Sequence, residues 1–375
     1  MGKVKLFFAG DFCSKPTTSY ISVSNELQDL IRGCDVSVVN FEVPLKPENV
    51  TLPPQQYERF FQHDDVPQFL RNMGFNLFSI ANNHLLDWGE KGYEKTVAVL
   101  GEDCFGAGTY EEAYRVKHVE VGGLKLGFMA LSYAAYAGVF DDVSNHEGVG
   151  CAYINDLKVN HVILEAKKDV DYLFVLPHDG IEYIDVPLPE TIARYRDFID
   201  YGADAVIGSH PHCPQGWEEY KGKPIFYSLG NFFFNSKEDT LYRAWNRPHW
   251  YEGVCVVMEI EKGLLQYSIV NTRNTDNISI SIDRDVVRDV HLQTLCRYLL
   301  DNEQYKNYLT EKINELNLMS IVDRTFHPKT FRRSVSTMLK CFLKKVRHQD
   351  FTDDFALKTL LRNDTRRSVL LRSMK

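Results

Sequence analysis

Residues that can bind metal ions follow five short apolar stretches of the chain. Stretch 5–10 is followed by Asp11, 36–40 by Glu42, 76–80 by Asn83 and His84, 172–176 by His178, and 205–207 by His210 and His212. Each stretch is typical of a buried strand. In an open α/β sheet, ligands bind beyond the carboxyl ends of the strands. We therefore expect these side chains to meet at one edge of a sheet, where their donor types indicate a metal centre.

The last two of these residues, His210 and His212, flank Pro211. Proline fixes its own φ at about −65° and favours an extended conformation in the residue before it. Residues two apart in an extended chain point to the same side. The motif therefore predicts two imidazoles presented to one metal centre. The alternative is a proline-stiffened loop whose histidines cap backbone groups.

This donor set has a definite chemistry. Two divalent ions about 3.5 to 4 Å apart can share a bridging carboxylate. Carboxylate, amide and imidazole ligands suit Mn, Fe or Zn, and the absence of a thiolate cluster argues against a structural zinc site. Water held between two such ions is deprotonated near neutral pH and can attack phosphorus, and a nearby histidine can protonate the leaving oxygen. The pattern thus favours metal-dependent hydrolysis of an anionic ester.

The pattern of apolar residues along the chain predicts the strands and helices that carry these side chains. Residues 1–120 alternate short apolar runs with helical patterns, which predicts βαβ units and a mainly parallel sheet. Glycine-containing turns predict hairpins over 116–131, 217–228 and 254–271, and 132–152 is expected to be a long loop. The pattern is wholly helical from about Asp285. We predict an α/β domain over 1–275 and a basic α-helical appendage over 276–375.

Composition is that of a globular protein, with 44% hydrophobic and 13% aromatic residues in 375. The longest apolar runs are shorter than the roughly 18 to 20 residues of a membrane helix. The segment from Met1 to Asp11 is interpreted as a first strand rather than a signal peptide. The eight cysteines are scattered, without a Cys-x-x-Cys pair, which is typical of reduced thiols in a cytosolic protein.

Charge is distributed unevenly. Residues 321–375 contain 14 Lys or Arg and 5 Asp or Glu, whereas the net charge of the whole chain is −8. A basic tail on an acidic body is most simply a solvated helical face. The alternatives are contact with a membrane surface, a polyanion or a synthase complex. Nucleic-acid binding is disfavoured, because the tail has no interleaved aromatic platform.

Seven motifs resemble, in order and at similar spacing, those of the CapA family of capsule and poly-γ-glutamate synthesis proteins. They are Asp11, Asn40–Leu45, Ser79–Gly89, Gly106–Thr109, His178–Tyr183, Gly208–His212 and Tyr227–Phe232. The resemblance spans about residues 4–260. That family is similar to the calcineurin-like metallophosphoesterases, so the resemblance implies a metallophosphoesterase-like β-sandwich flanked by helices, with two divalent ions.

The resemblance also implies roles for individual residues. Glu42 would bridge the two metals. Asn83, His178 and His210 would bind one ion, Asp11 and His212 the other, and His84 would protonate the leaving group. Metallophosphoesterases begin with Asp-x-His, whereas here Asp11 is followed by Phe12 and Cys13. Cys13 or water would have to supply the missing ligand.

Four further residues each have two interpretations. Cys13 is a packed thiol or a metal ligand, and Glu182 is a solvated charge or a carboxylate that orients an imidazole. Asp87 caps the following helix or orients His84, and Asn231 forms a tight turn or contacts substrate. The remaining histidines are interpreted as surface or packed residues: His63, His118, His146, His161, His249, His291, His327 and His348.

Two functions from different classes remain open. The first is a CapA-like metal-dependent hydrolase that acts on a phosphoester or related anionic substrate in capsule or exopolymer biosynthesis. The second is a catalytically degenerate protein that binds a polyanion or a partner in a synthesis complex. Either would be cytoplasmic, with the inner face of the membrane as a site of peripheral contact.

Overall fold

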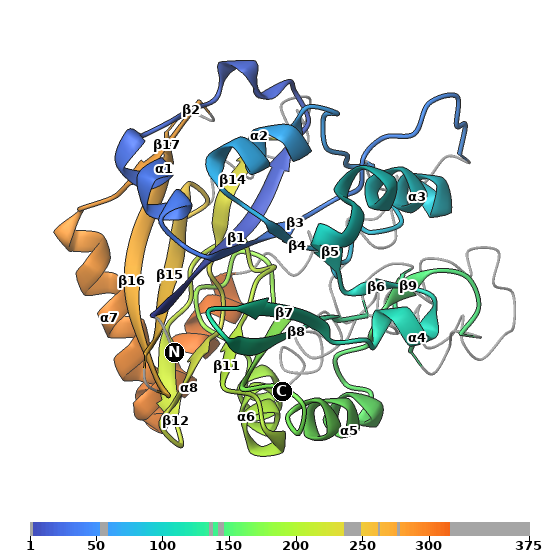
Figure 1. The fold of residues 1–375 in the computed structure, drawn as a ribbon. Helices are drawn as coiled ribbons and strands as arrows, with labels where there is room; N and C mark the ends of the chain where they lie inside the picture. Colours follow the sequence, from blue (N-terminus) through green and yellow to red (C-terminus); the bar gives the residue numbers. More distant parts are fainter. Residues whose placement is uncertain are drawn as a thin grey trace, which may run out of the picture.

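Two β-sheets face each other, and helices cover their outer sides (Figure 1). The computed structural model describes residues 3–52, 59–134, 138–141, 146–235, 249–261, 263–275 and 278–315. The predicted fold class, an α/β sandwich flanked by helices, is confirmed. Residues 316–375, which include most of the predicted basic appendage, lie outside the described part.

The larger sheet has nine strands within the described residues, and β14 pairs with β1 beside the main path. In spatial order the strands are β2 (Ser22–Val23), β17 (Ser279–Ile282), β16 (Leu264–Thr275), β15 (Glu252–Glu261), β1 (Val4–Ser14), β3 (Val36–Phe41), β4 (Leu77–Ser79) and β5 (Cys104–Phe105), with β14 (Asn231–Asn235). Strands β1, β3, β4 and β5 are parallel, as predicted. Strands β15 to β17 extend the sheet in antiparallel fashion.

The second sheet has six strands among the described residues. Its order is β12 (Trp217–Tyr220), β13 (Lys223–Phe226), β11 (Ala205–Ile207), β10 (Tyr172–His178), β8 (Leu124–Ser132) and β7 (Lys117–Val121). The three predicted hairpins are present as β7–β8, β12–β13 and β15–β16. Within the expected loop 132–152, β9 (Gly150–Cys151) pairs with β6 (Ala107–Gly108), while 135–137 and 142–145 lie outside the described residues.

Alternation along the strands builds the core between the sheets. Phe128 of β8 and Phe174 of β10 stack with ring centroids 5.3 Å apart, and Phe8 of β1 lies 5.5 Å from Phe174. The intervening residues of β8, Met129 and Leu131, face the opposite side. There they pack with α5 (Leu157–Ala166) and α6 (Pro189–Tyr201). One strand thus contributes to two apolar layers, because successive side chains point to opposite faces.

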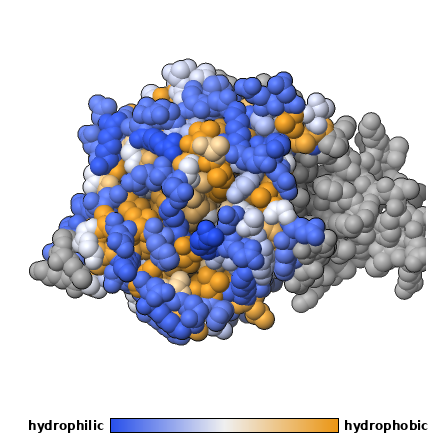
Figure 2. All heavy atoms as spheres, turned by 45° about the vertical axis from the view of Figure 1, so that its right-hand side comes forward, coloured by the Kyte–Doolittle hydropathy of each residue, from blue (hydrophilic) through white to orange (hydrophobic). Residues whose placement is uncertain are grey.

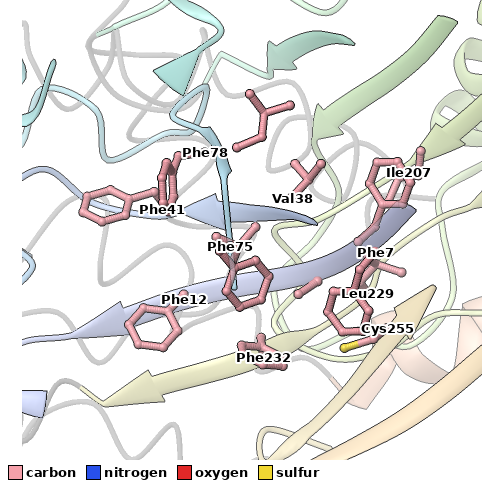
Figure 3. Close-up of a cluster of buried hydrophobic side chains, with 14 of the residues drawn as sticks. Phe7, Phe12, Val38, Phe41, Phe75, Phe78, Ile207, Leu229, Phe232 and Cys255 are labelled. Atoms are coloured by element: carbon pink, nitrogen blue, oxygen red, sulfur yellow. The ribbon is translucent and has the colours of Figure 1, made fainter. Parts of the chain in front are cut away.

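Helices in the crossovers cover the larger sheet. These are α1 (Asn25–Arg32), α2 (Val66–Met73) and α3 (Gly89–Leu100), and each buries apolar residues in the main cluster. A short helix, α4 (Tyr110–Ala113), follows β6. Figure 3 shows the aromatic filling beneath β1, where the Phe75 ring lies 6.0 Å from Phe7 and 5.5 Å from Phe232. This packing holds β1, β3 and β14 in the positions from which the polar residues emerge.

The helical pattern predicted after Asp285 forms α7 (Val286–Leu300) and α8 (Asn302–Glu315). Both pack on the body of the molecule. Leu292 and Leu295 of α7 join the main core, and the buried Arg288 donates hydrogen bonds to the carbonyls of Gly253 and Thr272. Strand β17 also lies beyond residue 275, so the larger sheet continues past the predicted domain boundary. The division into two domains itself stays a prediction.

No helix in the described ranges is long and apolar enough to cross a membrane. On the face shown in Figure 2, hydrophobic residues form patches separated by hydrophilic ones. The seven cysteines within the described residues are all free thiols, and all are buried or half-buried. Four of them lie in strands: Cys13, Cys104, Cys151 and Cys255.

Candidate metal centre

The six residues predicted to bind metal converge at one edge of the molecule. Asp11, Glu42, Asn83, His178, His210 and His212 are all buried. They come from the carboxyl ends of parallel strands in both sheets, since β1, β3 and β4 belong to the larger sheet and β10 and β11 to the smaller. The structure therefore brings these distant segments of the chain together, as expected.

Asp11 reaches this edge through an irregularity in β1. The strand continues to Ser14 rather than ending at Asp11, and its register with β3 and β14 shifts at this residue. The Asp11 N–H donates to the Gly230 carbonyl at 3.0 Å. A Cβ on Gly10 would lie 1.9 Å from that same oxygen. Only glycine at position 10 permits this close approach, and bulges of this kind re-aim side chains next to functional sites.

Asp11, Glu42 and His212 form one half of the site. Their ligand atoms lie within 4.8 Å of one another. His212 Nδ1 is 3.5 Å from Asp11 Oδ2, and His212 Nε2 is 3.7 Å from Glu42 Oε1. A hydrogen bond from Asn40 Nδ2 to Asp11 Oδ1, at 2.7 Å, fixes the aspartate.

Asn83, His178 and His210 form the other half. His178 Nε2 lies 2.9 Å from Asn83 Oδ1 and 3.2 Å from His210 Nδ1. On the far side of the ring, Nδ1 lies 2.9 Å from the Ser209 hydroxyl. Burial lowers the pKa of His178 well below its usual value, and the neighbouring histidines lower it further. The imidazole is therefore neutral, which is the form that binds metals.

Glu42 lies between the two halves. Its Oε1 is 3.7 Å from His212 Nε2 and 3.9 Å from His178 Nε2. The side chain is fully buried, and neither carboxylate oxygen has a hydrogen-bond partner among the described residues. Burial raises the pKa of Glu42 well above its usual value, and the charge of Asp11 raises it further. A buried carboxylate without partners is costly unless a cation compensates it. The residues present thus fit a divalent ion on either side of Glu42.

The backbone of the His210–His212 loop differs from the predicted extended form. His210 has φ 103° and His212 has φ 56°, conformations that residues other than glycine rarely adopt. The prediction of an extended chain was wrong here, because tertiary contacts override the local preference. In this turned conformation the His210 N–H donates to Asp11 Oδ2 at 3.2 Å. Backbone strain of this kind occurs mainly at functional sites.

His84 and Asp87 form a pair beside the six residues. His84 Nδ1 lies 2.9 Å from Asp87 Oδ2, which also accepts the Phe60 N–H at 2.8 Å. Burial lowers the pKa of His84, but the Asp87 carboxylate outweighs this effect and the pKa lies above its usual value. Asp87 does not cap α3, whose start has no side-chain cap. The carboxylate instead orients His84 and favours its protonated form.

The other candidates occupy distinct positions. Cys13 packs in an apolar cluster with Val43, Phe60, Phe234 and Trp250, and burial raises its thiol pKa well above the usual value. Glu182 lies in the turn after β10 and contributes to the raised pKa values of Glu42 and His84. Asn231 is the first residue of β14 rather than part of a tight turn.

Asn231 acts on His212. Its Oδ1 accepts a hydrogen bond from His212 Nδ1 at 2.9 Å, and its Nδ2 donates to the Trp250 carbonyl at 3.0 Å. This arrangement leaves Nε2 as the ring nitrogen with the lone pair, and Nε2 is the atom that faces Glu42. A hydrogen bond to the second ring nitrogen fixes the tautomer and the orientation of a metal-binding histidine.

Sequence reasoning missed several residues that hold the site together. Asn40 contacts Asp11 and Ser209 contacts His178, and both lie in the quoted motifs within two residues of a predicted ligand. Their position beside ligands was the available signal. His249 and His291, interpreted as surface or packed residues, meet Asp185 in a second cluster. Nothing in their local sequence indicates this, because neither follows a predicted strand.

Comparison with known proteins identifies the family. A family model described as "Bacterial capsule synthesis protein PGA_cap" matches residues 5–236. The chain belongs to this family. It is 31% identical over 180 residues to the capsule biosynthesis protein CapA of Bacillus anthracis, covering 46% of this chain and 43% of that protein. It is 29% identical over 220 residues to the PGA biosynthesis protein CapA of Bacillus subtilis, covering 57% of each chain.

The PGA_cap chain described here thus spans about half the length of these two CapA relatives. Among solved structures, a phosphatase from Mycoplasma pneumoniae is similar with a TM-score of 0.42 and 13% sequence identity. That match covers 72% of this chain and 94% of the phosphatase. In this PGA_cap protein the polar residues lie at the strand ends of both sheets.

Proposed function

We propose that this PGA_cap protein is a metal-dependent hydrolase that acts on a phosphoester or related anionic group. One observation carries the proposal. Glu42 is fully buried, has no hydrogen-bond partner among the described residues, and lies between His178 and His212. A folded protein retains such a group where a cation or a reaction requires it.

Bound Mn, Fe or Zn ions would polarise a phosphoryl oxygen and lower the pKa of water at the site. Asp11 and His212 would hold an ion on one side of this centre, and Asn83, His178 and His210 would hold one on the other. Glu42, which lies between the two sets, would be a ligand that both share. The pair of His84 and Asp87 stands outside the metal shell, where a protonated His84 donates its proton to the leaving oxygen.

The biological setting follows from the family. Two relatives carry the names capsule biosynthesis protein and PGA biosynthesis protein, so we place the reaction in capsule or poly-γ-glutamate synthesis. The substrate is an anionic polymer or a phosphoester. The protein acts in the cytoplasm, with the basic segment 321–375 contacting the inner membrane face or a synthase complex.

Metal content and hydrolysis test this function together. Purified protein loaded with Mn²⁺ is expected to contain about two equivalents and to cleave an aryl phosphodiester or monoester. Asp11→Ala and His210→Ala should each lower the metal content, whereas the exposed His161→Ala should not. Metal-free protein that cleaves no ester with any divalent ion would refute the hydrolase function.

A second function is favoured by one observation. The position of the histidine of the Asp-x-His motif is taken by Cys13, whose thiol packs in an apolar cluster. The half formed by Asp11, Glu42 and His212 therefore has three protein ligands among the described residues. A centre that holds a single ion would bind a polyanion or a synthesis partner without turnover. One metal equivalent, retained binding of poly-γ-glutamate and no hydrolysis would support this alternative.

A further inference from the structure

A second cluster of metal-binding side chains lies outside the site described above. Asp185 comes from the segment between β10 and α6, His249 from the turn before β15, and His291 from α7. One carboxylate oxygen and one nitrogen from each ring lie within 4.8 Å of one another. The two imidazole rings are nearly parallel, with centroids 4.7 Å apart. Three segments far apart in sequence thus bring a set of nitrogen and oxygen donors to one point.

Asp185 has an unsatisfied oxygen in this cluster. The residue is 4% exposed. Its Oδ2 accepts a hydrogen bond from the Tyr308 hydroxyl at 2.8 Å and lies 3.1 Å from His291 Nε2. Its Oδ1 is buried and has no hydrogen-bond partner among the described residues. Buried carboxylate oxygens normally have a hydrogen-bond donor or a cation as partner, so Oδ1 is free to bind an ion.

His249 is already oriented as a metal ligand. Its Nδ1 lies 2.8 Å from Glu252 Oε2, so in the neutral ring Nδ1 donates its proton to the carboxylate and the lone pair is on Nε2. Arg273 and Arg288 lie 3.6 Å and 3.7 Å from the same carboxylate and hold it in place. A carboxylate behind a histidine in this manner is a recurrent feature of zinc sites.

We propose that Asp185, His249 and His291 bind a divalent transition metal ion, with Zn²⁺ as the best fit. Two imidazoles and one carboxylate suit zinc, and water completes the coordination. The side chains of His249 and His291 are 29% and 30% exposed, which gives an ion and its water access from solvent.

This ion would fix two segments that line the first site. Tyr183, two residues before Asp185, stacks near His212 with ring centroids 6.2 Å apart. Trp250, next to His249, lies 5.1 Å from the same ring. The third ligand belongs to α7, so the ion also joins this helix to both segments. The second site therefore positions the wall around His212 without contacting the reacting groups.

Zinc counting tests the proposal separately from the proposed hydrolase function. The full chain, equilibrated with Zn²⁺ alone, is analysed by native mass spectrometry in a Glu42→Gln/His210→Ala background that disables the first site. One tightly bound equivalent is expected to remain. Adding His249→Ala and His291→Ala should remove it, whereas adding the exposed His161→Ala should leave it. Glu252→Gln should weaken Zn²⁺ binding by about 10- to 100-fold.

A second measurement covers the case in which the background variant does not fold. In otherwise unaltered protein, Zn²⁺ should slow amide hydrogen exchange in 183–186 and 249–252, and this protection should be clearly smaller in His291→Ala. His291 is partly exposed, so its truncation is compatible with folding. An unchanged zinc count in the His249→Ala/His291→Ala variant, or the same exchange protection without His291, would overturn the proposal.

Discussion

Two buried carboxylates of this protein differ in how their charge is accommodated. Asp185 accepts hydrogen bonds from Tyr308 and His291, which outweigh the effect of burial and hold its pKa below the usual value. Glu42 has no hydrogen-bond partner among the described residues, and burial raises its pKa well above the usual value. The surroundings of Asp185 stabilise its charge, whereas those of Glu42 oppose it.

This difference separates two kinds of site. A carboxylate whose charge is stabilised by hydrogen bonds, as that of Asp185 is through its Oδ2, contributes to folding whether or not an ion is bound. A cluster that keeps an unpaired buried charge destabilises the folded protein when no metal is bound. A bound cation offsets this destabilisation. The site around Glu42 keeps such an unpaired charge. We expect its residues to lower the stability of the metal-free protein, because the function of the site requires them.

The largest expected effect comes from Glu42→Gln. The variant should lose turnover and bind metal at least about 100-fold more weakly, because the shared ligand is gone. Without metal it should be more stable than the parent by about 1 to 3 kcal/mol, because an unpaired buried charge has been removed. Denaturant unfolding in EDTA and metal titration measure both. The exposed Glu48→Gln serves as control, and a destabilised Glu42→Gln would contradict the comparison.

The pair of His84 and Asp87 separates proton transfer from metal binding at the first site. His84→Ala should keep its metal and lose rate by about 10²- to 10⁴-fold. In Asp87→Asn the pKa of His84 should fall, because Asp87 is what raises it. The loss of rate at high pH should then begin at lower pH than in the parent. A metal-free His84→Ala protein, or an unmoved pH profile in Asp87→Asn, would contradict these roles.

Asp185→Asn is expected to change stability in the opposite direction to Glu42→Gln. Without metal it should lose about 1 to 3 kcal/mol near neutral pH, since hydrogen bonds to a charged acceptor are weakened. Because the pKa of Asp185 is depressed, this contribution disappears as pH falls below about 3.8. For Glu42 the pKa is raised, so the metal-free parent should lose stability as pH rises above about 4.5.

Unfolding of parent and variants in EDTA across this pH range measures the two contributions. The stability of the parent minus that of Glu42→Gln should fall as pH rises, whereas the stability of the parent minus that of Asp185→Asn should rise with pH. The exposed Asp29→Asn provides the control for the aspartate. Slopes of the same sign in both variants would show that the two carboxylates are not opposites.

The smallest expected effect is that of Cys13→Ala. The thiol packs among apolar side chains, so its removal should cost about 1 kcal/mol through the small cavity it leaves. Metal content should not change. Cys255→Ala, another fully buried thiol, is the matched control and should cost a similar amount. Loss of metal from Cys13→Ala alone would make this thiol a ligand of the first site.

The sequence predicted the first site because its residues obey a local rule. Each follows a recognisable apolar strand, and parallel strands end at one edge. The same rule could not find His249 or His291, since one precedes a strand and the other lies in a helix. It also placed Asn231 in a tight turn rather than at the start of a strand, because β14 pairs with the distant β1. The turned backbone at His210 depends on Asp11, which the proline rule does not take into account.

The contact between Gly10 and Gly230 has a consequence for the length of β1. Side chains alternate along this strand, so one residue inserted before Gly10 would turn Asp11 toward the aromatic core and Phe12 toward the polar edge. No neighbouring residue could take over, because the bare backbone at position 10 must meet Gly230. The amino-terminal strand should therefore tolerate conservative substitutions while rejecting even a single insertion or deletion.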